Sequence, residues 1–263
     1  MKTIYSYIQK ASELYDAHIH LFDHSGSIFE YVKIPKNITK VVGFMDVDFE
    51  KLEKYDENSV IQYYTDFINN HYDKDRMILL ATAPSASTMI ALYKCFPDII
   101  KGFGEVKCYK EYKGGALPFG NLDWVRELCE FDKDLCLPIY LHWYCYDNQR
   151  AEQLEKLIHD YPQIPFVLCH AGLSPKRPYR YQFDMVQKLL VNYTNLFADI
   201  SYEPMEFFIS NSYIMNMLPN KFIVGSDINI KSCKHNNVDF QRFILCSKLA
   251  KNNKNVLKNI FKL

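Results

Sequence analysis

Eight short apolar runs rich in β-branched residues recur along this chain, and longer amphipathic stretches separate most of them. Near-continuous apolar runs are typical of strands that are buried on both faces, as in a parallel sheet covered by helices. The runs occupy residues 17–22, 40–47, 77–84, 99–107, 137–144, 165–172, 196–201 and 221–228. Eight strand–helix units predict an α/β fold that closes into a (β/α)8 barrel rather than an open sheet.

Helical patterns fill most of the intervals between these runs. They cover residues 58–72, 86–96, 121–131, 149–161, 183–193 and 204–218, and the tail from residue 238 predicts one or two closing helices. The interval 17–39 is the exception, since it has no clear helix and is expected to hold an irregular loop or an inserted ribbon. A chain of 263 residues fits one such barrel, so residues 1–263 are predicted to form a single domain.

The bulk charge of the chain is balanced, with 31 basic and 31 acidic residues. This balance does not favour nucleic acid or a membrane surface as the partner. Eight cysteines are scattered without a CxxC pair, and the N-terminus lacks the apolar core of a secretory signal. No stretch approaches the roughly 18 apolar residues of a transmembrane helix. We therefore expect a soluble, cytoplasmic protein with reduced thiols.

Histidine and acidic residues fall where the predicted strands end. Barrel enzymes carry their chemistry at the C-terminal ends of the strands. His18 and His20 form a His-x-His pair in the first run, and alternate residues of a strand face the same way, so both imidazoles can bind one ion. Four further side chains end the fourth, fifth, sixth and eighth runs: Glu105, His142, His170 and Asp227.

Each of these residues has an ordinary explanation when it is taken alone. Two surface histidines often lie two residues apart, a buried histidine is usually a hydrogen-bonded core residue, and an aspartate after an apolar run is often a helix N-cap. The combination is harder to explain in this way, because four of the eight histidines join two carboxylates at inward strand positions. The sequence therefore predicts a metal centre at the mouth of the barrel.

The motifs that carry these residues resemble those of the amidohydrolase superfamily over nearly the whole chain. The matching segments are YDAHIHLF, GFGEVK, YLHWY, FVLCHAG, FIVGSD and the closing NVLKNIFK. The GSD ending and the tail are similar to amidohydrolase-related, metal-dependent hydrolases of the TIM-barrel fold, whereas the ligand set also resembles TatD-type deoxyribonucleases. This resemblance is specific for the superfamily and uninformative about the substrate.

The resemblance implies that His18, His20 and Asp227 hold the more buried ion. A bound zinc or manganese ion lowers the pKa of its water from about 16 toward about 7. Asp227 would take the proton as general base and deliver it to the leaving group. Mixed imidazole and carboxylate ligands suit Zn, Mn, Fe or Co, and zinc is the first expectation.

The same resemblance assigns His142 and His170 to a second ion, or gives one of them the task of polarising the substrate if a single ion is bound. Glu105 would bridge the two ions. A carbamylated Lys107 is the competing bridge, and Glu105 is preferred because it needs no modification and lies deeper in the barrel. Cys169 is predicted to face outward, because it precedes His170 along the strand.

Basic residues follow several strands at the predicted mouth, which suggests a small anionic substrate, a carboxylate or a phosphate. Lys107, Arg177 and Arg180 are the candidate substrate contacts, although a Lys-rich chain would place basic residues in these loops in any case. Trp143 is a candidate for an aromatic wall, with core packing as the equal alternative. The oligomeric state stays open, a homo-oligomer included.

Three functions compete for this site. The preferred one is a hydrolase that uses a metal-activated water to cleave an amide, ester, lactone or phosphoester bond. The second is a mononuclear decarboxylase of the amidohydrolase-related branch, against which Glu105 argues as an additional ligand. The third is a TatD-like deoxyribonuclease, against which the GSD context of Asp227 and the lack of a strongly basic surface argue.

Overall fold

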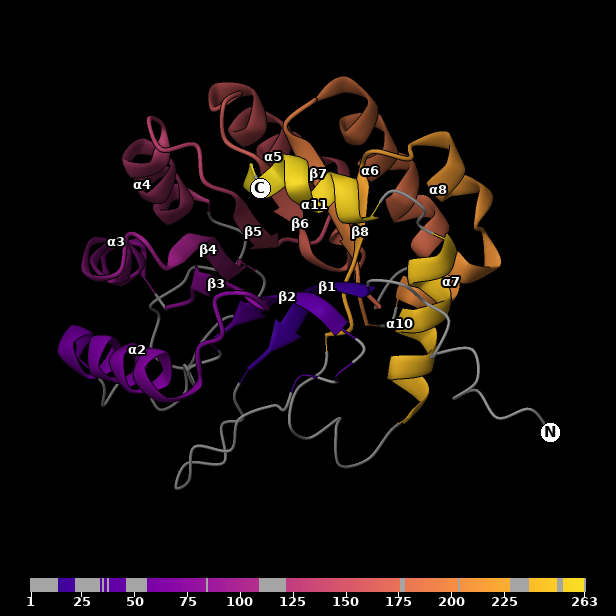
Figure 1. Ribbon diagram of the computed structural model, residues 1–263. Helices are drawn as coiled ribbons and strands as arrows, with labels where there is room; N and C mark the ends of the chain where they lie inside the picture. Colours follow the sequence, from indigo (N-terminus) through magenta and orange to yellow (C-terminus); the bar gives the residue numbers. More distant parts are fainter. Residues whose placement is uncertain are drawn as a thin grey trace.

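The computed structural model contains one sheet of eight parallel strands in the order β1-β2-β3-β4-β5-β6-β7-β8 (Figure 1). The strands are Leu14–His20 (β1), Ile38–Phe44 (β2), Met77–Ala81 (β3), Ile100–Lys107 (β4), Ile139–His142 (β5), Phe166–Leu168 (β6), Leu196–Ile200 (β7) and Phe222–Val224 (β8). Each strand overlaps one of the eight apolar runs, so the predicted barrel is confirmed. The structure describes residues 14–21, 34, 36, 38–45, 56–83, 85–108, 122–175, 178–202, 204–227, 237–249 and 253–262.

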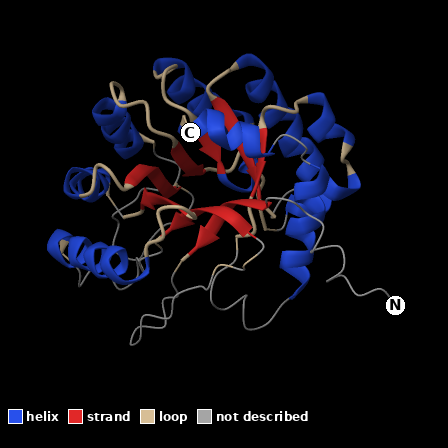
Figure 2. Ribbon diagram, in the orientation of Figure 1, coloured by secondary structure: helices blue, strands red, loops and turns tan. Residues whose placement is uncertain are grey.

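Helices follow β2 to β8, and Figure 2 shows them along the left, upper and right sides of the sheet. They are Glu57–His71 (α2), Ala86–Cys95 (α3), Asp123–Asp132 (α4), Asn148–Asp160 (α5), Tyr179–Asn192 (α6), Pro204–Ser210 (α7), Tyr213–Met217 (α8), Asn237–Leu249 (α10) and Asn253–Phe261 (α11), with the 3-10 turn Cys169–Gly172 (η2) after β6. Helix α2 begins at an N-cap, since the side chain of Asp56 accepts from the backbone N–H of Ser59 at 2.8 Å.

The predicted helix 204–218 is two short helices, α7 and α8. The first ends at Ser210, and the backbone N–H (3.0 Å) and side-chain amide (2.8 Å) of the next residue, Asn211, both donate to the carbonyl of Phe207. These bonds satisfy one of the carbonyls that the end of a helix leaves without an intrahelical partner.

The sheet closes where the end of β8 meets β1. The backbone N–H of Asp227 donates to the carbonyl of His18 at 2.8 Å, and that of Ser226 donates to Oδ1 of Asp16 at 2.8 Å. Gly225 leaves no room for a side chain there, since a Cβ would lie 2.3 Å from Cβ of His18. This close approach holds the segment after β8 directly against the His-x-His pair.

The interior of the barrel is filled by a layer of inward-facing apolar side chains that includes Phe44, Tyr140 and Cys169. Helix α11, yellow in Figure 1, packs against this layer, and the ring of Phe261 stacks on Tyr140 at 6.3 Å. The side chain of Asn253 connects α11 to the sheet. It accepts from the N–H of Val224 on β8 (3.1 Å) and donates to the carbonyl of Tyr15 on β1 (3.0 Å). Tyr15 lies near the start of β1, so the His and acidic residues at the strand ends occupy the opposite end of the barrel.

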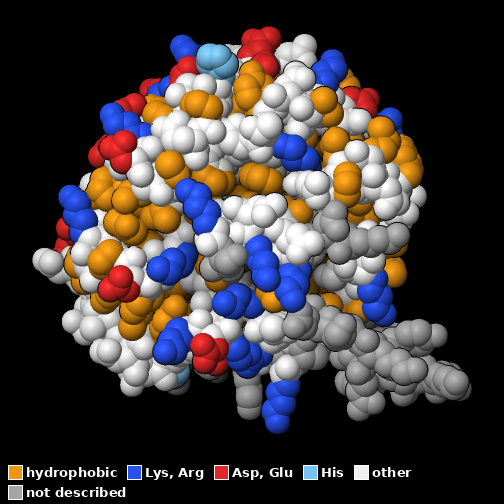
Figure 3. All heavy atoms as spheres, turned by 45° about the horizontal axis from the view of Figure 1, so that its top comes forward, with side chains coloured by type: hydrophobic (Ala, Val, Ile, Leu, Met, Phe, Trp, Pro, Cys, Tyr) orange, Lys and Arg blue, Asp and Glu red, His pale blue; other side chains and the backbone are white. Residues whose placement is uncertain are grey.

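Figure 3 shows Lys and Arg side chains interspersed with acidic and hydrophobic ones on one face. None of the helices in the described ranges is long and apolar enough to cross a membrane. The loop predicted within 17–39 lies largely outside the described residues, and so do residues 109–121 and 228–236 at the predicted mouth.

Candidate metal centre

The His-x-His pair of β1 and Asp227 form one triad of donor atoms. Nε2 of His18 lies 3.2 Å from Nε2 of His20, so both rings point the same way as strand alternation predicts. Oδ1 of Asp227 lies 2.8 Å from Nε2 of His20 and 3.4 Å from Nε2 of His18. Asp227 reaches this position with a positive φ of 54°, three residues after the end of β8.

Glu105, His142 and His170 form a second triad from β4, β5 and η2. Oε1 of Glu105 forms a short contact with Nδ1 of His142 and lies 3.6 Å from Nε2 of His170. The residue before Glu105 is Gly104, whose φ is +131° and whose missing Cβ would lie 2.7 Å from Cβ of Tyr140. A glycine is therefore needed to bring the carboxylate of Glu105 close to β5.

Glu105 lies between the two triads. Its Oε1 faces the second triad, while its Oε2 lies 4.0 Å from Nε2 of His20 in the first. The ammonium of Lys107 lies 3.6 Å from the same Oε2, so Lys107 faces the same way as Glu105. Glu105 is the deeper of the two, with 2% of its side chain exposed against 14% for Lys107. This division of its two oxygens is the arrangement that a bridging carboxylate requires.

Outer hydrogen bonds orient three of the four imidazoles. Nδ1 of His18 lies 2.6 Å from Oδ2 of Asp199. Hydroxyl groups contact the two histidines of the other triad: Oγ of Ser201 lies 3.0 Å from Nδ1 of His170, and Oη of Tyr144 lies 2.8 Å from Nε2 of His142.

These outer contacts test whether the residues fit a metal. A metal-binding histidine characteristically offers one ring nitrogen to the ion and its other N–H to a carboxylate, carbonyl or hydroxyl partner. His18, His142 and His170 follow this pattern, and their inner nitrogens converge on two triads. Imidazole and carboxylate donors in threes suit divalent transition metals. The side chains present therefore fit metal binding.

The pKa values of two buried groups, Asp227 and His170, also indicate a site that favours a bound cation. Burial alone would raise the pKa of Asp227, yet the hydrogen bond with His20 and the charges of His18 and His170 lower it to about 2. Burial would likewise lower the pKa of His170, but the hydrogen bond with Glu105 and the charge of Asp227 raise it to about 9. The carboxylates thus favour positive charge in their midst, which a divalent cation supplies.

Two of the remaining predicted substrate contacts, Trp143 and Arg180, make contacts of other kinds in the structure. The side chain of Trp143 is buried, and its indole N–H donates to the carbonyl of Arg150 at 3.1 Å, so the structure favours the packing alternative. Arg180 is exposed on the first turn of α6, where it donates to the hydroxyl of Tyr213 at 2.7 Å and pairs with Asp184 at 3.3 Å. Arg177 lies outside the described residues.

The prediction that Cys169 faces outward is wrong. Its Sγ lies within 4.8 Å of donor atoms of His18 and Asp199, and Cys169 packs with Val167 in the interior layer. Strand alternation puts Val167 and Cys169 on the same inward side. His170 is also directed inward because β6 ends at Leu168 and His170 takes a positive φ of 54° in η2.

Sequence reasoning missed the outer partners Asp199, Ser201 and Tyr144. A signal for Asp199 was present, since an acidic residue inside the apolar run LFADIS needs a buried partner. Asp16 in YDAHIH carried the same signal, and its Oδ1 accepts from the backbone N–H of His18 at 3.1 Å. Ser201 and Tyr144 are the last residues of their apolar runs, and nothing in the local sequence indicates that their hydroxyl groups contact a histidine.

No protein-family model matches the sequence, and no curated protein matches it either. Solved structures do share its fold. An amidohydrolase from Burkholderia multivorans with bound zinc has a TM-score of 0.65 at 8% identity, over 96% of this chain and 100% of that one. The neighbours are amidohydrolase-superfamily barrels.

Two further neighbours of this barrel are decarboxylases. A 2,6-dihydroxybenzoate decarboxylase from Rhizobium has a TM-score of 0.58 at 13% identity, over 95% of this chain and 98% of that one. A dihydroxybenzoic acid decarboxylase from a Polaromonas species, with bound manganese and the inhibitor 2-nitroresorcinol, has a TM-score of 0.52 at 13% identity, over 92% and 97%. At these identities the likeness is one of fold, and the reaction does not follow from it.

Proposed function

We propose that this chain is a metal-dependent hydrolase of the amidohydrolase superfamily that binds two divalent ions. His18, His20 and Asp227 would hold the first ion, His142 and His170 the second, and Glu105 would bridge them. Zinc is the first expectation, with manganese, iron and cobalt as alternatives. The observation that carries the proposal is the position of Glu105, whose two oxygens face different triads.

Ions bound in such a site lower the pKa of a coordinated water toward about 7 and polarise the carbonyl or phosphoryl oxygen under attack. The low pKa of Asp227 keeps its carboxylate unprotonated, so it can accept a proton from the attacking water and pass it to the leaving group. The ring of His170 lies 5.5 Å from the ring of His18, and its Nε2 lies 3.6 Å from Oε1 of Glu105.

The position of Lys107 supports the proposal that the substrate is anionic. Its ammonium is mostly buried beside Glu105 at the end of β4, where it can neutralise a carboxylate or phosphate held next to the ions. An amide, ester, lactone or phosphoester of a small acid is therefore the proposed substrate class. The seven described cysteines are free thiols, which suits the cytoplasm as its location.

The test is metal analysis of purified wild-type protein beside Glu105→Ala and His18→Ala. We expect two equivalents of metal in the wild type and a loss in both variants, with activity on a panel of esters, lactones, amides and phosphoesters lost in parallel. His159→Ala is the matched control, since His159 is exposed on α5 and should leave the metal content unchanged. A wild type that binds no metal after incubation with Zn²⁺ or Mn²⁺ would refute the proposal.

A decarboxylase is the second candidate, favoured by the two decarboxylases among the structures that share this fold. One equivalent of metal that is insensitive to Glu105→Ala would favour this alternative. Release of CO₂ from a panel of aromatic acids, including dihydroxybenzoates, would then establish it.

A further inference from the structure

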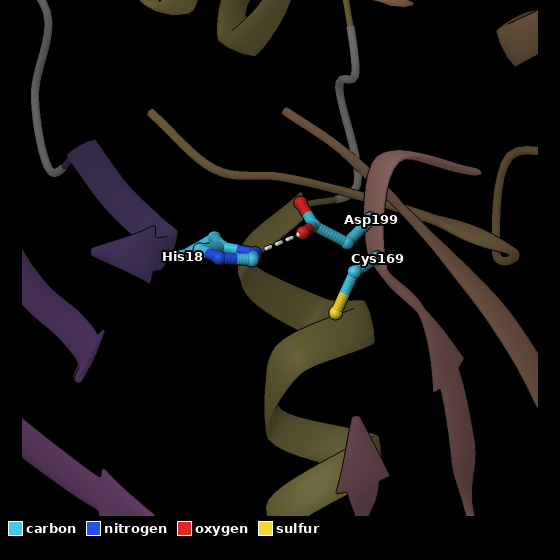
Figure 4. Close-up of side chains that lie close together, drawn as sticks. All are labelled: His18, Cys169 and Asp199. Atoms are coloured by element: carbon cyan, nitrogen blue, oxygen red, sulfur yellow. Dashed lines mark hydrogen bonds and ion pairs between the residues drawn. The ribbon is translucent and has the colours of Figure 1, made fainter. Parts of the chain in front are cut away.

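Cys169, Asp199 and His18 form a third group of donor atoms beside the two triads. A thiol sulfur, a carboxylate oxygen and a ring nitrogen lie within 4.8 Å of one another, and all three residues are fully buried. Figure 4 shows the ring of His18 reaching from β1 toward Asp199 of β7, with Cys169 beside them. The group lies on the side of His18 that faces away from His20, because Nδ1 meets Asp199 and Nε2 meets His20.

The chemistry of this group differs from that of the two triads. Sulfur is a soft donor that selects ions such as Cd²⁺ or Zn²⁺ over Mn²⁺ or Mg²⁺. Two further oxygens in this region, Oδ1 of Asp199 and Oη of Tyr140, are buried and accept or donate no hydrogen bond within the described part of the chain. Buried polar atoms generally have partners, so these atoms are available to an ion or to its water ligands.

We propose that Cys169, Asp199 and His18 bind a thiophilic divalent ion at a third site, which shares His18 with the first triad. On binding, the sulfur–metal bond replaces the S–H bond of Cys169, and the thiol proton leaves to solvent. The imidazole proton of His18 moves from Nδ1 to Nε2, so that the lone pair of Nδ1 faces the ion. No electron is transferred.

This tautomer change makes the third site compete with the first triad. A neutral imidazole has a single lone pair, so His18 serves either the ion beside Cys169 or the ion held with His20 and Asp227. An excess of a thiophilic ion would therefore displace the first-triad ion and inhibit the enzyme. This consequence rests on the proposed function, whereas the third site itself does not.

The test is titration of metal-free protein with Cd²⁺ alone, following the ultraviolet sulfur-to-cadmium charge-transfer band. We expect the wild-type band to saturate at one equivalent and Cys169→Ser to lose it. Cys129→Ser is the matched control, because Cys129 is a buried thiol on α4 outside the group, and it should keep the band. A band that survives in Cys169→Ser, or a wild type without a band, would overturn the proposal.

X-ray absorption at the cadmium edge gives a second readout that needs no variant. The wild type with one equivalent of Cd²⁺ should show one sulfur neighbour together with nitrogen and oxygen neighbours. A cadmium ion with no sulfur neighbour, or with two or more, would contradict the site. This result does not depend on whether Cys169→Ser folds.

Competition between Mn²⁺ and Cd²⁺ distinguishes a failure of this proposal from a failure of the proposed function. Preloading with Mn²⁺ should weaken cadmium binding at Cys169 by about tenfold or more, because both ions need His18. If the cadmium band depends on Cys169 but is unchanged by preloading with Mn²⁺, the third site is supported and the assignment of His18 to the first triad is refuted.

Discussion

Nδ1 of His18 lies 2.6 Å from Oδ2 of Asp199, and both side chains are fully buried. Oγ of Ser201 donates to the same Oδ2 at 2.9 Å and lies 3.0 Å from Nδ1 of His170. One carboxylate on β7 therefore orients a histidine of the first triad directly and a histidine of the second through a hydroxyl group.

Asp199→Asn should weaken the binding of zinc by about 10- to 100-fold, the usual cost of losing an outer partner of a metal ligand. The amide keeps the size of the side chain but loses the charge that orients the Nδ1–H of His18. Isothermal titration calorimetry measures the change. Asp184→Asn removes an exposed carboxylate on α6 and should bind zinc as the wild type does. If both variants bind zinc with the same affinity, Asp199 does not orient His18 for metal binding.

Gly225→Ala should disturb both the fold and the metal centre. The new Cβ would lie 2.3 Å from Cβ and 2.7 Å from the backbone nitrogen of His18, so β1 and the segment after β8 would have to separate. Overpacking of this kind costs about 1–3 kcal/mol of unfolding free energy. Gly43→Ala is the comparison, because its Cβ would meet the flexible end of the Leu21 side chain. Denaturant unfolding should show the larger loss for Gly225→Ala, and the reverse order would contradict the packing argument.

Lys221→Met should destabilise the barrel without affecting metal binding. The ammonium of Lys221 donates to three backbone carbonyls, those of Tyr193 (2.6 Å), Thr194 (3.2 Å) and Leu196 (3.1 Å). Methionine has a similar shape but removes the ammonium donor from all three carbonyls, of which that of Tyr193 keeps the N–H of Leu196 at 3.3 Å, and we expect a cost of about 1–3 kcal/mol. Lys188→Met, an exposed position on α6, should unfold at the wild-type denaturant concentration. If both variants unfold like the wild type, the three contacts contribute nothing to stability.

Asp132→Asn should change how stability depends on pH. Burial raises the pKa of Asp132 to about 8, from an ordinary value of 3.8, so the folded protein keeps a proton that the unfolded chain releases. The contribution of Asp132 to the free energy of unfolding is fully present below about pH 4. It decreases by about 1.4 kcal/mol per pH unit as the pH rises to about 8.

Asparagine keeps an acceptor for the N–H of Leu137, 3.2 Å from Oδ1, but does not titrate. Unfolding of Asp132→Asn measured from pH 4 to pH 8 should therefore lack this slope, while Asp134→Asn, at an exposed position, should retain it. The same slope in both variants would place the titration elsewhere.

The six candidate ligands could be proposed from the sequence because each lies within three residues of the C-terminal end of a strand. A barrel brings all C-terminal strand ends to one mouth, so residues as far apart as His18 and Asp227 meet once the fold is known. The same logic failed at Cys169, since it assumed that β6 continues through His170. The chain instead leaves the strand at Leu168 and turns with positive φ at His170 and Ala171.

What the sequence by itself determined was the period of its apolar runs, and with it the eight-stranded barrel and the identity of the inward residues at the strand ends. What only the tertiary structure decided was how these residues divide into triads, which oxygen of Glu105 faces which triad, and which side chains orient the imidazoles. The physical reason is that strand periodicity is a local property of the backbone. Contacts such as His18 with Asp199 join residues 181 positions apart, and their distances depend on how the whole barrel packs.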